Sequence, residues 1–67
     1  MQVTITVNGE QKQLQAATLA DVITLYELEN QLVVLEADGV IVPKDQWVQT
    51  EVRDGMVLEI VHFVGGG

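Results

Sequence analysis

The sequence contains no cysteine and no serine, and its only histidine is His62. Without cysteine, disulfides, thiolate metal sites and cysteine nucleophiles are excluded. A single histidine completes neither a catalytic triad nor a zinc site, because both require several side chains that act together. We therefore interpret His62 as a partly exposed strand residue, and we expect no metal site.

Glycine-rich loops that bind phosphates are also missing, because no such loop precedes a predicted helix. The 67 residues suffice for one domain, 1–67, and leave no room for both a walled active site and its scaffold. The hydrophobic fraction of 48% is ordinary for a globular domain and too high for a disordered chain. We expect a folded protein that is not an enzyme and binds no cofactor.

Basic residues are scarce, because three lysines and arginines stand against ten acids and give a net charge of −7. Nucleic acids and anionic membrane surfaces attract basic residues, so neither is expected as a partner. The charge could favour a partner with a basic docking surface, although a solvated acidic surface is the simpler interpretation. We find no signal peptide and no run of the ~20 apolar residues that span a bilayer, so a cytoplasmic location is expected.

Alternating apolar and polar residues at the N-terminus predict a hairpin. Val3, Ile5 and Val7 alternate with polar residues, which is typical of a half-buried strand. The pair Asn8–Gly9 follows and favours a type I′ turn, because both residues tolerate positive φ. The returning strand, residues 10–16, is polar, so we place it at an edge of the sheet.

A capped amphipathic helix is predicted over residues 18–29. The Thr18 hydroxyl is placed to accept a hydrogen bond from the backbone N–H of Asp21, whose charge also suits the positive end of a helix. Asn30 is the predicted left-handed stop. Apolar residues recur at helical spacing along one face, at Leu19, Val22, Ile23 and Tyr26.

The middle of the chain alternates between apolar runs and turns. Residues 32–35 form a continuous apolar run, which predicts a buried strand. Asp38–Gly39 marks a turn, and residues 40–42 form a short extended piece after it. Residues 43–47 begin with proline, which suits the first turn of a short helical segment. Trp47 is expected to anchor this loop on the core.

The final strand is predicted over residues 56–63, after a turn at Asp54–Gly55. All the predicted segments together give one main helix and a mixed sheet of four or five strands. Such an arrangement belongs to the α+β class, in which the helix packs on one face of the sheet.

A glycine tail ends the chain after this apolar strand. Glycine carries the largest entropy cost on ordering, so three glycines serve no folding purpose. Such a tail suits backbone that passes through a narrow channel of another protein. It reaches about 13 Å at roughly 3.3 Å per residue, and consists of Val64, Gly65, Gly66 and Gly67. We expect the tail to be flexible and to carry its carboxylate into a partner's active site; a frayed chain end is the alternative.

The terminal carboxylate of Gly67 is a poor acyl donor until it is activated. An α-carboxyl group is ionised at neutral pH, and its leaving group would be oxide. ATP provides the simplest activation, by formation of an acyl-adenylate. The activated carbonyl can then take sulfur or acylate a lysine. Both steps need an enzyme that this chain is not, so the sequence predicts a carrier on which other enzymes act.

Several segments resemble the ThiS family of sulfur carrier proteins. Residues 58–67 resemble that family's C-terminus, and residues 18–21 are similar to its helix start. Residues 42–47, Val-Pro-Lys-Asp-Gln-Trp, resemble its Val-Pro-Arg-x-x-Trp loop, and Asp54–Gly55 stands at its turn before the last strand. With the N-terminal strand and Asn8–Gly9, the resemblance covers essentially the whole chain. Three positions depart from the usual residues of the family, Asp38, Lys44 and Met56, and the segment of residues 26–31 is longer than the end of the family's short helix.

The resemblance implies a ubiquitin-like β-grasp fold, in which the last strand is central and parallel to the first. It also implies a sulfur carrier for the thiazole of thiamine. In that family's chemistry, a ThiF-type enzyme uses ATP and magnesium to adenylate the group that corresponds to Gly67. The adenylate becomes a thiocarboxylate with sulfur from a donor protein, and the sulfur then passes to thiazole synthase, ThiG.

The period of two in the last strand assigns its side chains to two faces. Leu58 and Ile60 are predicted to point into the core, whereas Glu59, Val61 and Phe63 point outward. Exposed apolar residues beside the tail would form a docking patch for partner enzymes. The alternative, that loops of the protein itself cover them, stays open at this point.

Other classes of protein share the Gly-Gly end. The sulfur carrier of molybdopterin synthase uses the same chemistry with a different acceptor, and ubiquitin-like modifiers end as an amide on lysine. The loop of residues 43–47 favours ThiS over the molybdopterin carrier. A third alternative is a passive interaction domain whose tail has no role.

Overall fold

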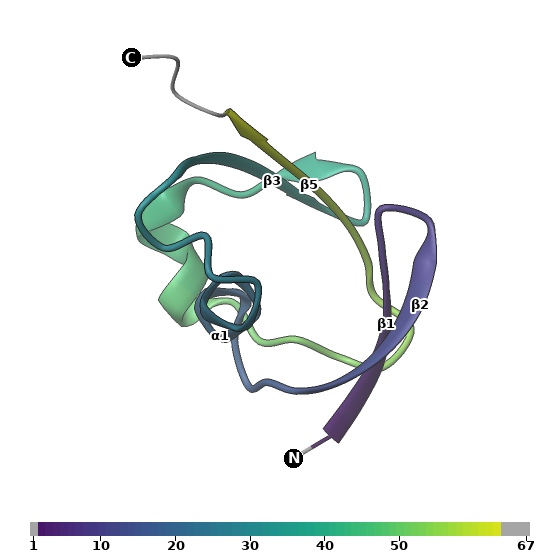
Figure 1. Ribbon diagram of the computed structural model, residues 1–67. Helices are drawn as coiled ribbons and strands as arrows, with labels where there is room; N and C mark the ends of the chain where they lie inside the picture. Colours follow the sequence, from purple (N-terminus) through teal and green to yellow (C-terminus); the bar gives the residue numbers. More distant parts are fainter. Residues whose placement is uncertain (1, 64–67) are drawn as a thin grey trace.

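Five strands form one mixed sheet that curves around helix α1 (Figure 1). The computed structural model describes residues 2–63 of the chain. Within this range, no helix is long and apolar enough to cross a membrane. The elements, in chain order, are β1 (Gln2–Val7), β2 (Glu10–Gln15), α1 (Leu19–Leu25), β3 (Leu32–Ala37), β4 (Val40–Ile41), the 3₁₀ helix η1 (Lys44–Gln49) and β5 (Val57–Phe63).

The strand order in the sheet is β2-β1-β5-β3-β4, so β5 lies at its centre. Strands β1 and β5 run parallel, whereas the pairs β1–β2, β3–β5 and β3–β4 are antiparallel. The last strand is therefore central and parallel to the first. This confirms the α+β class and the β-grasp arrangement, with five strands rather than four.

The first hairpin forms at the predicted turn. Asn8 and Gly9 have φ values of 50° and 82°, in the left-handed region that a type I′ turn requires. Strand β2 pairs with β1 along its whole length and has no second neighbour among residues 2–63, which confirms the polar edge strand. On β1 the alternating residues Val3, Ile5 and Val7 are all buried, as predicted.

Helix α1 begins at the predicted cap. The Asp21 N–H donates to Oγ1 of Thr18 (3.4 Å), and Oδ2 of Asp21 accepts from the N–H groups of Ala17 (2.9 Å) and Thr18 (3.1 Å). The backbone hydrogen bond from Ala17, followed by that from Thr18, lowers the pKa of the Asp21 carboxyl group. The first contact confirms the predicted cap at Thr18, and the contacts of Oδ2 complete a capping box that fixes the start of the helix.

The predicted C-terminal end of the helix is wrong. The helix does not run to residue 29 and stop at Asn30, because Glu27 already takes a left-handed φ of 57°. Two backbone hydrogen bonds form a Schellman motif there: Glu27 N–H to the Thr24 carbonyl (2.9 Å) and Leu28 N–H to the Ile23 carbonyl (3.0 Å). The partly buried Leu28 packs against the core. This tertiary contact favours the earlier stop.

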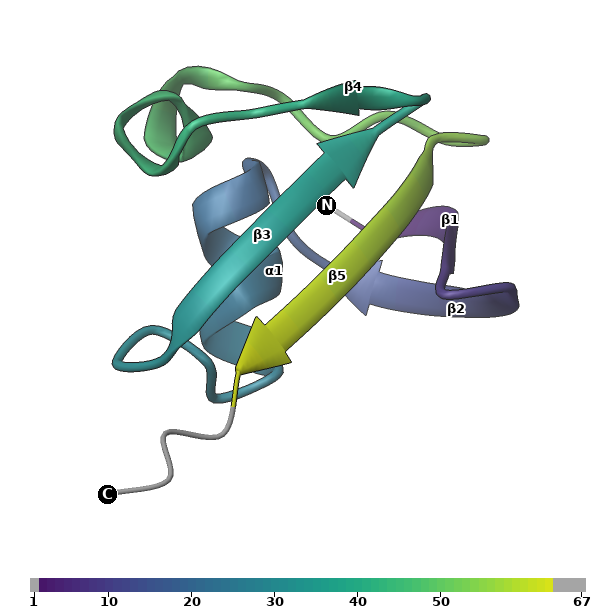
Figure 2. The ribbon, with the colours of Figure 1, turned by 90° about the horizontal axis from the view of Figure 1, so that it is seen from above.

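The prediction of a buried strand over residues 32–35 is wrong for two of its four residues. Leu35 is fully buried, but Leu32 and Val34 are 71% and 39% exposed. Successive side chains of a strand point to opposite faces. Helix α1 covers only one face of the sheet, so alternate residues of β3 remain on the open face (Figure 2).

The loop between β3 and β5 is anchored by Trp47. Its side chain is buried, and Nε1 donates to the Val42 carbonyl (2.8 Å), which confirms the predicted anchor. Pro43 lies before η1 in an extended conformation rather than in the first turn of the helix. The turns at Asp38–Gly39 and Asp54–Gly55 form as predicted, and β5 begins one residue later than predicted.

The core lies between α1 and the covered face of the sheet. Strands β1, β3 and β5 and the helix all contribute to it. Its largest fully buried side chains are Ile5, Leu19, Val22, Ile23, Leu35 and Leu58. Burial of apolar area at this centre holds β5 in place, and β5 is the strand that leads to the C-terminus.

Candidate functional site

Strand β5 presents two different faces. Leu58 and Ile60 are buried, whereas Glu59, Val61 and Phe63 are exposed on the opposite face. The period-two prediction for this strand is therefore confirmed. Since Val61 and Phe63 are 53% and 52% exposed, the alternative that loops of the protein cover them is wrong.

Two residues of β3 extend this exposed surface. In the antiparallel register Leu32 lies opposite Phe63, and Val34 lies opposite Val61. Directly opposed side chains of neighbouring strands share one face and lie in contact distance. We call these four residues the apolar patch. Figure 2 shows β3 and β5 side by side, with α1 behind them and nothing in front of them among the described residues.

The contribution of Leu32 and Val34 to the patch was not predicted from the sequence. Their run of four apolar residues resembles a strand buried on both faces, and the periodicity of that run alone gives no other indication. The useful signal lies in the partner strand. Once β5 is paired antiparallel with β3, the outward residues Val61 and Phe63 identify the β3 residues beside them.

Two acidic residues border the apolar patch. Glu36 of β3 lies directly opposite Glu59 of β5, and like charges in such a pair repel each other. Among residues 2–63, the one ion pair joins Lys12 and Glu10 on β2 (3.3 Å). Neither Glu36 nor Glu59 has an ion-pair partner among residues 2–63, and acidic side chains at the border of the patch suit a basic group on a partner.

His62 is exposed and lies opposite Val33 of β3. Its position agrees with the prediction of a strand residue. Within the described part of the chain, no three His, Cys, Asp or Glu side chains gather in a group that could hold a metal ion.

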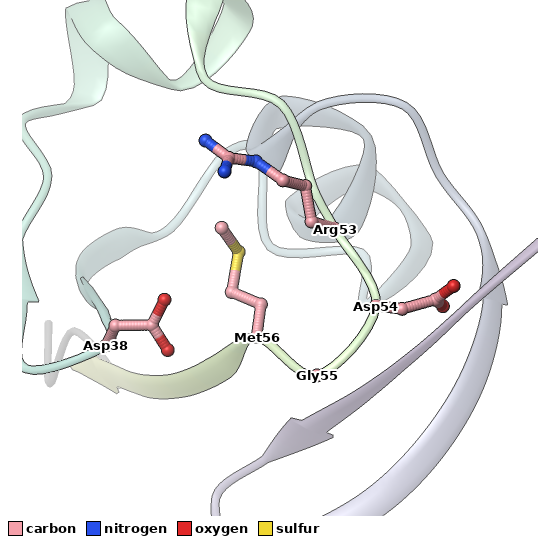
Figure 3. Close-up of a pocket in the computed structure, with 5 residues that line it drawn as sticks. All are labelled: Asp38, Arg53, Asp54, Gly55 and Met56. Carbon is pink, nitrogen blue, oxygen red and sulfur yellow. The ribbon is translucent and has the colours of Figure 1, made fainter.

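An open hollow of about 220 Å³ lies at the other end of β5, where the strand begins. Figure 3 shows the residues that line it, which are Asp38, Arg53, Asp54, Gly55 and Met56. Both of its carboxylates bind backbone N–H groups: Oδ1 of Asp54 accepts from Thr4 (2.8 Å), and Oδ1 of Asp38 accepts from Val57 (2.9 Å). These two carboxylates therefore hold the turn and the strand through backbone hydrogen bonds.

Two of the three departures from the ThiS pattern, Asp38 and Met56, line this hollow. The third, Lys44, begins η1. None of the three belongs to the apolar patch. The predicted reactive residue, Gly67, and the predicted threading residues, Val64, Gly65 and Gly66, lie outside the described residues, so their roles stay predictions.

Comparison with known sequences gives a consistent result. The model of the ThiS family matches residues 5–67. The sulfur carrier protein ThiS of Bacillus subtilis is 44% identical over 50 residues, which cover 75% of this chain and 76% of that protein. A thiazole synthase of Paramagnetospirillum magneticum is 38% identical over 65 residues, which cover 94% of this chain and 20% of that protein.

Comparison with solved structures agrees with the sequence matches. The crystal structure of the thiamine biosynthesis protein ThiS from Geobacter metallireducens superposes with a TM-score of 0.78 at 25% identity, and the match covers 97% of this chain and 100% of that chain. A solution structure of a thiamine biosynthesis protein from the same organism gives the same TM-score and identity over 97% and 88% of the two chains. The β-grasp fold is thus shared along nearly the whole length.

Proposed function

The chain belongs to the ThiS family of sulfur carrier proteins, and from this premise we propose that its reactive group is the C-terminal carboxyl group of Gly67. A ThiF-type enzyme adenylates this group with ATP and magnesium, and sulfur from a donor protein converts the adenylate to a thiocarboxylate. The thiocarboxylate then delivers sulfur to thiazole synthase, ThiG, in thiamine biosynthesis. The family match, which runs through residue 67, carries the proposal.

The chemistry needs activation, because a carboxylate has no good leaving group. In the first step, a carboxylate oxygen of Gly67 attacks the α-phosphorus of ATP, and pyrophosphate leaves. In the second step, sulfur at the oxidation level of sulfide, which the donor protein supplies as hydrosulfide, attacks the carbonyl carbon. A carbon–sulfur bond forms, the carbon–oxygen bond to AMP breaks, and AMP leaves with the electrons of that bond. The carrier supplies only the carboxyl group. ATP, magnesium and the catalytic side chains belong to the partner enzyme.

The apolar patch supports the proposal through its place in the sequence. Four residues, Val64 to Gly67, follow Phe63, and four extended residues span at most about 13 Å. An active site that receives Gly67 therefore has to lie near the end of β5, with Val64, Gly65 and Gly66 in its channel. The docking residues that we assign are Glu59, Val61 and Phe63, together with Leu32 and Val34.

The thiazole synthase relative supports ThiG as the sulfur acceptor. A segment of that protein, 20% of its length, is similar to 94% of this chain. A carrier-like segment within the same chain as a synthase meets it at high effective concentration. The matches include a sulfur carrier protein ThiS, a thiazole synthase and a thiamine biosynthesis protein ThiS, and these favour thiazole formation over the molybdopterin and protein-modifier alternatives.

Intact-mass measurement tests the proposal. The purified chain is incubated with a ThiF-type enzyme, ATP, magnesium and a sulfur donor. The expected product is heavier by the replacement of one oxygen by one sulfur. Absence of this shift, under conditions that convert the Bacillus subtilis carrier, would contradict the proposal. Heavier covalent adducts on a denaturing gel would instead indicate a protein modifier.

Two variants separate chemistry at the tail from folding of the domain. Deletion of Gly67 shortens the reach of the carboxylate, and one added alanine after Gly67 moves the carboxylate away from its position. Both variants should lose the mass shift and keep the unfolding curve of the unmodified chain. If either variant is converted as fast as the unmodified chain, the site is not the Gly67 carboxyl group.

A further inference from the structure

The hydrogen-bonded ladder between β1 and β5 is short. It pairs Thr6 with Val57 and Val7 with Leu58, and it ends where the Asn8 N–H donates to the Leu58 carbonyl (2.9 Å). The chain then turns back into β2. A parallel strand that continued would offer its next peptide groups to the residue two positions further along β5.

The side chain of Asn8 takes the place of these missing peptide groups. The N–H of Ile60 donates to Oδ1 of Asn8 (2.7 Å), and Nδ2 of Asn8 donates to the Ile60 carbonyl (3.0 Å). A carboxamide carries an acceptor and a donor, as the backbone does. The turn alone does not require asparagine, because aspartate and glycine also suit a left-handed first position. Of these three residue types, only asparagine satisfies both backbone atoms of Ile60.

After Ile60, β5 pairs with one neighbour only among the described residues. Val61, His62 and Phe63 lie opposite residues of β3, and none of them pairs with β1. The Asn8 contact is therefore the last described attachment on the β1 side of β5. It fixes the backbone of Ile60 on the β1 side of the strand, while β3 pairs with Ile60 on the other side.

We propose that Asn8 is a positioning residue for the C-terminal end of β5. Its carboxamide fixes Ile60, and this sets the orientation in which Val61 and Phe63 meet a partner enzyme. Asn8 acts through the strand and not on the reacting carboxyl group. The enzymatic part of this inference rests on the proposed function, whereas its structural part does not.

Two substitutions test the contact without loss of the turn. Asn8→Gly removes both hydrogen bonds to Ile60. Asn8→Asp keeps the acceptor and sets a carboxylate oxygen against the Ile60 carbonyl. In both variants, amide hydrogen exchange at Ile60 and His62 is expected to accelerate by about tenfold, as loss of one or two hydrogen bonds implies. Exchange at Val57 should stay unchanged.

The chain offers a matched control at the other hairpin. Asp38 also has a left-handed φ, 51°, precedes a glycine in its turn, and binds β5 through its side chain, where Oδ1 accepts from Val57. It contacts the start of β5 rather than the end. Asp38→Gly should accelerate exchange at Val57 and leave Ile60 unchanged.

The enzymatic measurement is pyrophosphate exchange with a ThiF-type enzyme, with the carrier as the varied substrate and all variants fully folded. The KM for Asn8→Gly and Asn8→Asp is expected to rise about tenfold while kcat changes less than about twofold, since a docking surface is misplaced and the carboxyl group is unaltered. Asp38→Gly should leave both constants within about twofold of the unmodified chain.

The possible outcomes separate the two proposals. An unchanged KM in both Asn8 variants overturns the positioning role, and so does an equal rise in Asp38→Gly, because the effect then follows stability alone. If the unmodified chain is not adenylated, the proposed function fails. The exchange data still decide the structural part, because unchanged exchange at Ile60 in Asn8→Gly overturns it.

Discussion

The two ends of β5 are held in different ways. At its start, Val57 and Leu58 pair with β1, Leu58 also pairs with β3, and the Val57 N–H donates to Asp38. Leu58 is fully buried. At its end, Val61 and Phe63 pair with β3 alone and are about half exposed. We therefore call residues 57–58 the anchored end of β5, and residues 61–63, which are exposed to solvent and to partners, its presented end.

This difference comes from the neighbours of the strand and not from its composition, since both ends are apolar. The proposed function places a reactive carboxyl group four residues beyond β5. Such a group needs a strand with a fixed start, because movement of the strand would change the position of the group. It also needs a surface that is free for recognition. Separation of these roles along one strand allows the core to supply stability while the apolar patch is available for binding.

The largest expected effect tests the anchored end. Leu58→Ala removes a fully buried side chain and should lower the free energy of unfolding by about 2–5 kcal/mol. Phe63→Ala at the presented end should cost less than about 1 kcal/mol, because its side chain is half exposed. Urea unfolding of the two variants measures the difference. Equal losses would show that the end of β5 belongs to the core.

The next effect tests the presented end. Val61→Asp or Phe63→Asp places a charge in the apolar patch and should raise the KM of the carrier with a ThiF-type enzyme by about tenfold to a hundredfold. The far-ultraviolet circular dichroism should stay unchanged. Val48→Asp is the control, because Val48 is 66% exposed on η1, outside the patch. If Val61→Asp, Phe63→Asp and Val48→Asp have a similar KM, the docking surface does not include the apolar patch.

Local patterns in the sequence predicted the features that depend on nearby residues. The N-cap at Thr18, which binds Asp21, and the turn at Asn8–Gly9 each involve residues within four positions of each other. Both features can therefore be predicted from a short stretch of sequence. The orientation of Val61 and Phe63 follows from the period of two. The period of two thus predicts two of the four residues of the apolar patch, Val61 and Phe63.

Features that depend on distant residues were not predictable in this way. The early helix stop at Glu27 depends on the packing of Leu28 against the core. The exposure of Leu32 and Val34 depends on which face α1 covers. The hydrogen bonds of Asn8 join residues 52 positions apart, and the Asn-Gly pair indicates only the turn, because it is a common pair in type I′ turns.

A smaller effect is expected at the turn before β5. Oδ1 of Asp54 accepts from the Thr4 N–H (2.8 Å), so Asp54→Ala should cost about 1 kcal/mol of unfolding free energy. The same variant should keep the KM of the unmodified chain with a ThiF-type enzyme, because it alters the anchored part only. Urea unfolding measures the free energy of this variant, and pyrophosphate exchange on the same preparation measures its KM. A raised KM would couple the turn to the docking surface and weaken the separation of the two ends.

The smallest effect concerns acid and the start of α1. Hydrogen bonds from Ala17 and Thr18 lower the pKa of Asp21 from its ordinary value of 3.8, so the folded chain binds a proton there less readily than the unfolded chain. The stability from this group is complete above the unfolded pKa and is lost as the pH falls through the lower folded pKa. Asp21→Asn should therefore flatten the acid dependence of the unfolding free energy.

Protonation of the other carboxylates also relieves repulsion in a chain of net charge −7, so only the difference between the variant and the unmodified chain isolates Asp21. Urea unfolding across a pH series provides this difference. Amide shifts of Ala17 and Thr18 should follow the Asp21 titration, because both N–H groups donate to the Asp21 carboxylate. Those of Val61 and Phe63 should not, because these residues pair with β3 and make no described hydrogen bond to the capping box. If the amide shifts of Val61 and Phe63 follow the same titration, protonation of Asp21 changes the conformation of the apolar patch. The two ends of β5 are then not independent.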